Sequence, residues 1–150
     1  MFPLSITGSI KLQAISPQQV SGVVASIVAA LERERASNVS IIGNTISFRA
    51  GVFRFVSRWN VLVPVASGTL EVKAGAPGSI VFRFSCIQFL AIFTTIVLIL
   101  GLALPSEVST VSHLVIPLVA WLWLFGMNYL IAAIRLPSFV RRAAEAANRQ

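Results

Sequence analysis

The first residues of the chain alternate regularly between apolar and polar side chains. The even positions from 4 to 14 are apolar or small, and the odd positions between them are Ser5, Thr7, Ser9, Lys11 and Gln13. A period of two places every second side chain on the same face of an extended strand. The pattern therefore predicts a strand with one face buried against a core and the other face in water.

A helical pattern comes next. Apolar side chains recur every three or four positions, at Val20, Val23, Val24, Ile27, Val28 and Leu31. This spacing predicts a helix with a single apolar stripe. Ser16, Pro17 and Gln19 have the residue types and spacing of an N-cap, a first helical residue and a capping box. We therefore expect the helix to begin directly after Ser16 and to end in the charged residues 32–35.

After the helix, the two-residue period returns and continues to residue 84. Gly43 and Asn44 interrupt it in a way that is typical of a tight hairpin turn, and Ser67 and Gly68 give a second turn signal. A change of parity at Gly51 indicates a bulge or bend, and it leaves open one additional short strand near 52–56.

These segments predict an α+β domain over residues 1–83, in the element order β-α-β-β-β-β. One helix is expected to cover one face of a mostly antiparallel sheet. The polar face of this sheet is expected to carry Arg49, Lys73 and Arg83. No flexible linker follows the last strand, so we expect the domain to hold a defined orientation relative to the next segment.

That segment, residues 84–134, contains two long uncharged stretches separated only by Glu107. A helix needs roughly 20 apolar residues to cross about 30 Å of hydrocarbon. Both stretches meet this requirement, and a soluble core of this size cannot bury two helices that are apolar on all sides. The sequence predicts a transmembrane helical hairpin with spans at about 85–104 and 114–134.

Composition and charge support a membrane location. The chain has 56% hydrophobic and 11% charged residues, a mean hydropathy of +0.84 and a net charge of +7. Because basic residues flank the hairpin but do not occur within it, the positive-inside rule predicts a multi-pass protein of the cell membrane with both termini cytoplasmic. Four residues are expected to lie at the membrane edge, where they would contact anionic lipid headgroups: Arg83, Arg135, Arg141 and Arg142.

The last residues, 135–150, are expected to form a basic cytoplasmic tail. Apolar and charged side chains fall on opposite sides of a helix built over this region. This arrangement is typical of a short helix on the membrane surface. A frayed basic tail is the alternative.

Few polar side chains occur inside the predicted spans. Asn128 is the most polar of them, and Thr94 and Thr95 are its candidate partners across the hairpin. Gly126 would allow another helix to approach closely. We expect these four residues to make helix-packing or oligomer contacts, through which the chain self-associates or joins a membrane protein partner. An oligomeric channel or transporter with a cytoplasmic sensor domain is an alternative, although the spans lack the charges that usually mark such a path.

The residue inventory does not favour an enzyme, a metal site or a cofactor site. The chain has no aspartate, one histidine (His113) and one cysteine (Cys86), and no phosphate-binding glycine loop. The basic and aromatic residues at 53–59 favour lipid contact over nucleic acid. We expect a non-catalytic, membrane-anchored interaction, scaffold or accessory subunit. A membrane-tethered ligand sensor, with its pocket on the sheet of the head or near 53–59, is a second alternative.

Overall fold

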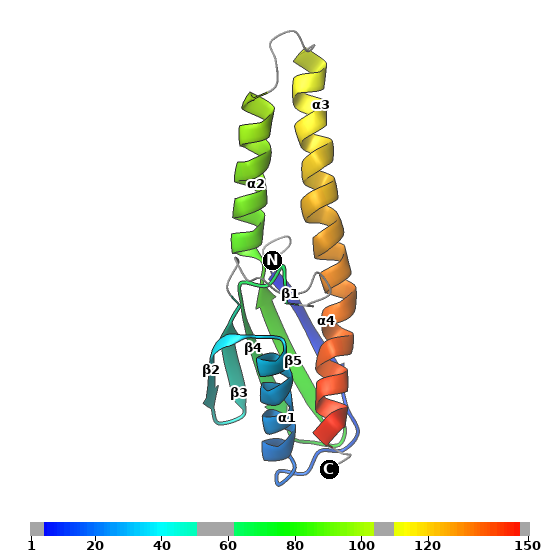
Figure 1. Ribbon diagram of the computed structural model, residues 1–150. Helices are drawn as coiled ribbons and strands as arrows, with labels where there is room; N and C mark the ends of the chain where they lie inside the picture. The colour runs from blue at the N-terminus through cyan, green and yellow to red at the C-terminus, as the bar shows by residue number, and fades with distance from the viewer. Residues whose placement is uncertain (1–4, 51–61, 104–109, 148–150) are drawn as a thin grey trace.

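A five-stranded antiparallel sheet forms the centre of the head, in the strand order β1-β5-β4-β3-β2 (Figure 1). The computed structural model describes residues 5–50, 62–103 and 110–147. The strands are β1 (Ser5–Lys11), β2 (Ser37–Ile42), β3 (Thr45–Arg49), β4 (Ser67–Lys73) and β5 (Ser79–Ser85). With helix α1 (Val20–Arg33) between β1 and β2, the described chain has the predicted order β-α-β-β-β-β. The α+β class is confirmed.

Two antiparallel helical arms project from one end of this sheet (Figure 1). The first arm is α2 (Ile87–Leu102), which begins two residues after β5 ends. The second arm, residues 110–134, is the upper part of one continuous helix. This helix has three parts: α3 (Thr110–Trp121), the π-helical turn η1 (Leu122–Gly126) and α4 (Met127–Ala146). The upper part of this helix lies beside α2, and α4 continues down along the head.

Only one described helix is both long and apolar enough to cross a membrane, by length and composition. It is the 32-residue stretch Val115–Ala146, whose most apolar window is only 11% buried. The helix α2 is apolar but has 16 residues. The structure therefore gives weak support for membrane association and leaves the two-span arrangement as a proposal.

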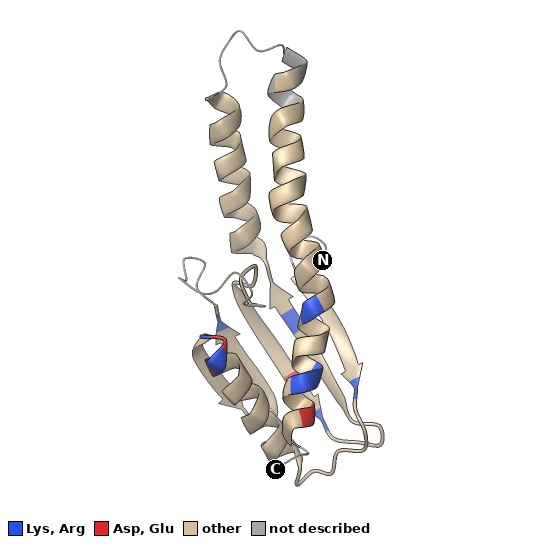
Figure 2. Ribbon diagram, turned by 45° about the vertical axis from the view of Figure 1, so that its right-hand side comes forward, with Lys and Arg blue, Asp and Glu red and all other residues tan. Residues whose placement is uncertain are grey.

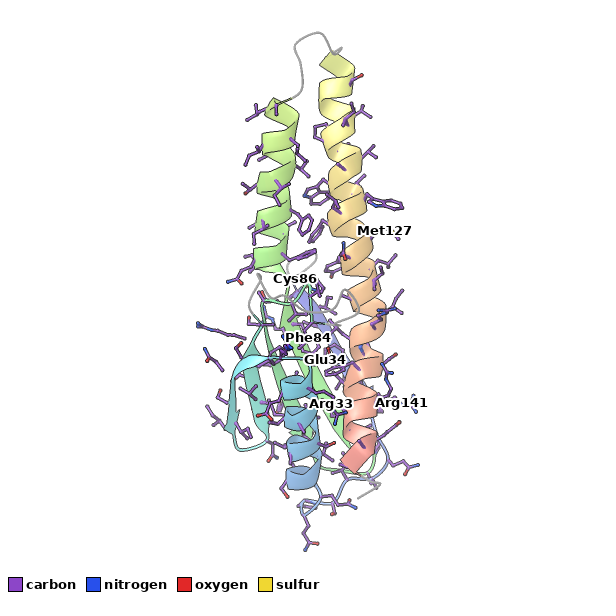
Figure 3. All side chains as sticks on the ribbon, viewed as in Figure 1. Arg33, Glu34, Phe84, Cys86, Met127 and Arg141 are labelled. Atoms are coloured by element: carbon purple, nitrogen blue, oxygen red, sulfur yellow. The ribbon has the colours of Figure 1, made fainter. Side chains whose placement is uncertain are left out.

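The core of the head lies on one face of the sheet, beneath α1 and α4. The even-numbered side chains of β1, β3, β4 and β5 point to this side, and on β2 the odd-numbered ones do, because Ile41 pairs with Ile46 of β3. The predicted stripe of α1 is buried against the sheet apart from the half-buried Val28. Figure 3 shows Phe84 and Cys86 between the sheet and the helices. The largest buried side chains of the three central strands are Ile46, Phe48, Leu70, Ile80, Phe82 and Phe84.

The C-terminal region differs from both forms expected for a basic tail. Leu136 and Val140 are fully buried in the core of the head, and Ser26 Oγ on α1 donates a hydrogen bond to the Ala143 carbonyl at 2.7 Å. Two helices therefore cover the sheet, where one was expected. The predicted apolar side of the C-terminal helix exists, but it packs on the head and not on a membrane surface.

The expected turn at Ser67 and Gly68 is wrong, because both residues lie within β4. A Cβ atom at Gly68 would lie 2.4 Å from Phe84 Cδ1 and 2.6 Å from Phe48 Cε1. The glycine therefore leaves room for two aromatic rings from the neighbouring strands, whose centroids are 5.9 Å apart. The chain turns earlier, at residues 62–64.

The other predicted helix and turn boundaries agree more closely. Gly43, with a φ of +59°, begins the two-residue β2–β3 turn, which closes between Ile42 and Thr45. The helix α1 begins at Val20, because residues 17–19 first form a separate turn. Gln19 Oε1 still accepts the predicted hydrogen bond from the Ser16 backbone N–H, at 3.0 Å. Residues 51–61, with the expected bulge, the optional strand and the aromatic cluster at 53–59, lie outside the described residues.

Candidate functional site

The outer surface of the two helical arms is almost entirely apolar. Figure 2 shows no charged residue on α2 or on the upper part of the long helix, and Figure 3 shows Met127 pointing away from α2. The large apolar side chains that are 42–87% exposed include, on α2, Ile96, Leu98, Ile99, Leu100 and Leu102, and on the long helix, Val115, Ile116, Leu118, Val119, Leu122, Trp123, Met127, Leu130, Ile131 and Ile134. A continuous apolar surface of this kind marks contact with lipid or with another protein.

Aromatic rings fill the space between the two arms. Phe125 lies 6.1 Å from Phe89, 5.1 Å from Trp121 and 5.8 Å from Tyr129, measured between ring centroids. Trp121 Nε1–H donates a hydrogen bond to Thr94 Oγ1 at 3.0 Å. Of these ring pairs, Phe89 and Phe125 join the two arms, and the Trp121–Thr94 hydrogen bond adds a polar contact at mid-height on α2.

Farther from the head, a glycine lets α2 approach α3 closely. A Cβ atom at Gly101 would lie 3.0 Å from Cγ of Pro117. At Gly126, by contrast, a Cβ would meet no other part of the described chain within 4 Å beyond the adjoining backbone of its own helix. Within this chain Gly101 therefore has the packing role that was expected of Gly126.

Thr94 bonds across the hairpin as expected of it, but its partner is Trp121 and not Asn128. Asn128 Nδ2 donates to the Leu124 carbonyl of its own helix at 2.6 Å, and Thr95 Oγ1 donates to the Ala91 carbonyl at 3.0 Å. The structure does not pair Asn128 with either threonine. Sequence reasoning missed Trp121 as the partner, although a buried indole N–H generally requires an acceptor.

The four arginines expected at the membrane edge lie at two different levels of the head. Tyr129 Oη contacts the Ser5 carbonyl at the arm end of β1, and Arg135 follows about 9 Å farther along α4. Arg83 is paired with Thr7 of β1, so it lies near the same end of the sheet. Arg141 and Arg142 lie farther down. Arg141 is bonded to Glu145 at 2.7 Å and lines a hollow with Lys11, at the opposite end of the sheet.

The face of the sheet opposite α1 and α4 is polar. The odd-numbered side chains of β3, β4 and β5 lie on this face and fall into rows because these strands are in register. One row consists of Arg49, Ser67 and Ser85, and the adjacent row consists of Ser47, Thr69 and Arg83. These six residues line a hollow of about 490 Å³, which we call the arginine–hydroxyl hollow. Two guanidinium groups thus occupy diagonal corners of a grid whose other four members are hydroxyls.

No acidic side chain lines this hollow among the described residues. The nearest carboxylate on the same face, Glu71, lies 3.5 Å from Lys73. Both Arg49 and Arg83 are exposed, and neither has an ion pair within the described part of the chain. The hollow is therefore a region of uncompensated positive charge.

The remaining reactive residue types form no cluster. Cys86 is fully buried in the core of the head, and His113 lies in α3, where its side chain is outside the description. Within residues 5–50, 62–103 and 110–147, no group of three His, Cys, Asp or Glu side chains could hold a metal ion.

The arms and the hollow are therefore the two features that suggest a function. No family model, curated protein or solved structure matches the chain.

Proposed function

We propose that the protein is a two-span protein of the cell membrane whose cytoplasmic head serves as a non-catalytic interaction or accessory module. The single observation that carries this proposal is the apolar outer surface of both arms. In water, each square ångström of such surface is unfavourable by about 25 cal/mol relative to burial. A lipid bilayer removes this penalty along the whole length of both arms.

The dimensions of the arms fit a bilayer. The 16 residues of α2 extend about 24 Å, and the uncharged stretch of the sequence continues from 84 to 106. The second arm has 25 residues from Thr110 to Ile134, which extend about 38 Å before the first charge at Arg135. Hydrocarbon thickness is about 30 Å, so a tilted hairpin of this size could span it.

The distribution of charge supports a cytoplasmic head. The first basic residues beyond the arms, Arg83 on β5 and Arg135 on α4, both lie on the head side. Because the chain enters and leaves the arms from the head, both ends of the chain would be on the cytoplasmic side, together with the head.

Contact with a further membrane helix is the second part of the proposal. Asn128 donates to its own helix through Nδ2, and no described residue donates to its Oδ1. An amide oxygen in hydrocarbon is stabilised by a donor on a neighbouring helix. The open space around Gly126 would also allow such a helix to approach closely. A second copy of the chain or another membrane protein could supply this helix.

The first test is extraction of membranes from cells that produce the full chain. We expect the protein to remain in the pellet in alkaline carbonate and to be released by detergent. Release by carbonate alone would overturn the membrane assignment. Purified protein in lipid discs should contain two or more copies, or a co-purified membrane protein, and a lone monomer would exclude the helix contact.

Orientation needs introduced cysteines, because the buried Cys86 is inaccessible from either side. In a Cys86→Ala background, Ser109→Cys marks the connection between the arms and Ser9→Cys marks an exposed position on the head. An impermeant maleimide added to intact cells should label only Ser109→Cys. Labelling of Ser9→Cys alone would show the opposite orientation.

A further inference from the structure

The arginine–hydroxyl hollow has the chemistry of a phosphate site. Each guanidinium presents several N–H donors in a planar fork that matches the oxygens of a phosphate. The four hydroxyls between and beside the arginines, on Ser47, Ser67, Thr69 and Ser85, add further donors. No lining carboxylate would repel an anion.

The register of the sheet lets both arginines serve one ligand. Arg49 on β3 and Arg83 on β5 are separated by β4 and by two residues along the strands. Their Cα atoms are therefore about 12 Å apart, given a strand spacing of about 4.8 Å and a rise of about 3.3 Å per residue. Side chains of this length can reach toward each other over Ser67 and Thr69, which lie between them on β4.

One wall of the hollow is already ordered by a hydrogen bond. Ser47 Oγ and Ser40 Oγ, on β3 and β2, lie 2.8 Å apart. In such a pair only one hydroxyl donates to the other, so one hydroxyl hydrogen is still available for a ligand.

We propose that the arginine–hydroxyl hollow binds the phosphate group of a phosphate ester, and that this ester is a lipid headgroup. A phosphomonoester fits best, because it presents more terminal oxygens to the two arginines than a diester does. The phosphate would lie over β4 between Ser67 and Thr69, with Arg49 and Arg83 on opposite sides.

The position of the hollow favours a lipid as the source of the phosphate. The row that contains Ser85 lies two residues, or about 7 Å, before the first residue of α2. The headgroup layer on each side of a bilayer is about 5–8 Å deep. If α2 spans the membrane as proposed above, headgroups reach this row of the sheet. The lipid source depends on that proposal, whereas the phosphate chemistry does not.

The test uses the purified full chain in a mild non-ionic detergent, with binding measured by isothermal titration calorimetry. The probes are dioctanoyl phosphatidic acid, glycerol 3-phosphate, inorganic phosphate and, as a phosphodiester lipid, dioctanoyl phosphatidylglycerol. The variants are Arg49→Gln with Arg83→Gln, and Thr69→Val, which removes the central hydroxyl. Lys11→Gln with Lys73→Gln is the matched control. It removes the same charge from the same face of the sheet, at the end away from the arms.

We expect phosphatidic acid to bind to the natural chain and to the lysine control equally. The double arginine variant should bind it at least about tenfold more weakly, because each lost bond is to a charged group. Thr69→Val should weaken binding to a smaller extent. Phosphatidylglycerol should bind more weakly than phosphatidic acid in every case. All four proteins should have the same melting temperature, because the changed side chains are exposed.

The other outcomes separate the parts of the proposal. Arginine-dependent binding of glycerol 3-phosphate as tight as that of phosphatidic acid would support the phosphate site and overturn the lipid source. Equal losses in the arginine and lysine variants, or no binding of any probe, would overturn the site itself. Either of these results could occur with a protein that still resists carbonate extraction, so failure of the hollow is distinguishable from failure of the membrane anchor.

Discussion

Trp121 and Thr94 form a hydrogen bond across the helical hairpin, with the indole Nε1–H as donor and Thr94 Oγ1 as acceptor at 3.0 Å. Thr94 lies at the middle of α2, and Trp121 is the last residue of α3. An indole N–H that is left without an acceptor in an apolar environment is unfavourable. The bond therefore favours one rotation of α2 and one position along its axis relative to the long helix. The contact between the Phe89 and Phe125 rings alone would not specify these.

The first prediction is that Thr94→Val destabilises the hairpin. Valine has nearly the shape of threonine but cannot accept the indole N–H. Hydrogen bonds between membrane helices contribute about 0.6 kcal/mol on average and up to about 1.7 kcal/mol. We expect a loss in this range in reversible unfolding from mixed micelles. Trp121→Phe, alone and combined with Thr94→Val, completes a double-mutant cycle that isolates the pair.

Thr95→Val is the matched control for this prediction. The Thr95 hydroxyl bonds to the Ala91 carbonyl of its own helix, so its loss leaves the contact between the helices unchanged. We expect a smaller effect than at Thr94. Equal effects at the two positions, or a double-mutant cycle without coupling, would show that the bond does not join the arms.

A second prediction concerns the close approach at Gly101. Gly101→Val introduces branched carbon atoms where a single Cβ would already lie 3.0 Å from Pro117. The proline ring is rigid, so the two helices must separate. We expect a loss of about 1–3 kcal/mol in the stability of the hairpin. Gly126→Val, at a position with open space, should leave the hairpin stable and reduce self-association. If Gly126→Val destabilised the hairpin and Gly101→Val did not, Gly126 and not Gly101 would be the glycine that packs within the hairpin.

A third prediction tests the tight packing around Gly68. Gly68→Ala places a methyl group against the rings of Phe48 and Phe84, both of which are buried in the core. Overpacking of this kind costs about 1–3 kcal/mol, which chemical denaturation of the full chain in detergent would measure. Gly22→Ala is the control, since it adds a methyl group to α1 in open space and should stabilise the helix by up to about 1 kcal/mol. A neutral Gly68→Ala would mean that the strands separate easily at this point.

The same residue shows where local sequence patterns fail. Serine followed by glycine between two apolar segments is typical of a turn, and the sequence predicted one at Ser67 and Gly68. The reason for the glycine is found elsewhere, in two phenylalanines on neighbouring strands whose rings need the space. Alternation and helical spacing predicted the strands β1, β3 and β5 and the buried stripe of α1, because these patterns follow directly from which face is buried.

The candidate sites also depend on contacts between distant segments, which local sequence patterns do not predict. The sequence placed Arg49 and Arg83 on the polar face of the sheet, and the structure confirms that position. That both line one hollow depends on the order β3-β4-β5 and its register, which local patterns do not specify. The sequence likewise marked Thr94 as a helix contact but paired it with Asn128, because the rotation of each helix about its axis is set by packing.

The last prediction separates a docked C-terminal helix from a loose tail. Leu136 is fully buried in the core of the head, whereas Ile134, two residues earlier on the same helix, is 66% exposed. Leu136→Ala should therefore destabilise the head by about 2–5 kcal/mol, and Ile134→Ala should leave its stability in detergent nearly unchanged. Chemical denaturation would measure the stability of the head in each variant. Limited proteolysis near β1 and α1 would then show whether the surface that α4 covers has become accessible. If the two variants behaved alike, the head would be stable without α4, and the C-terminal residues would form the independent tail that their charge suggested.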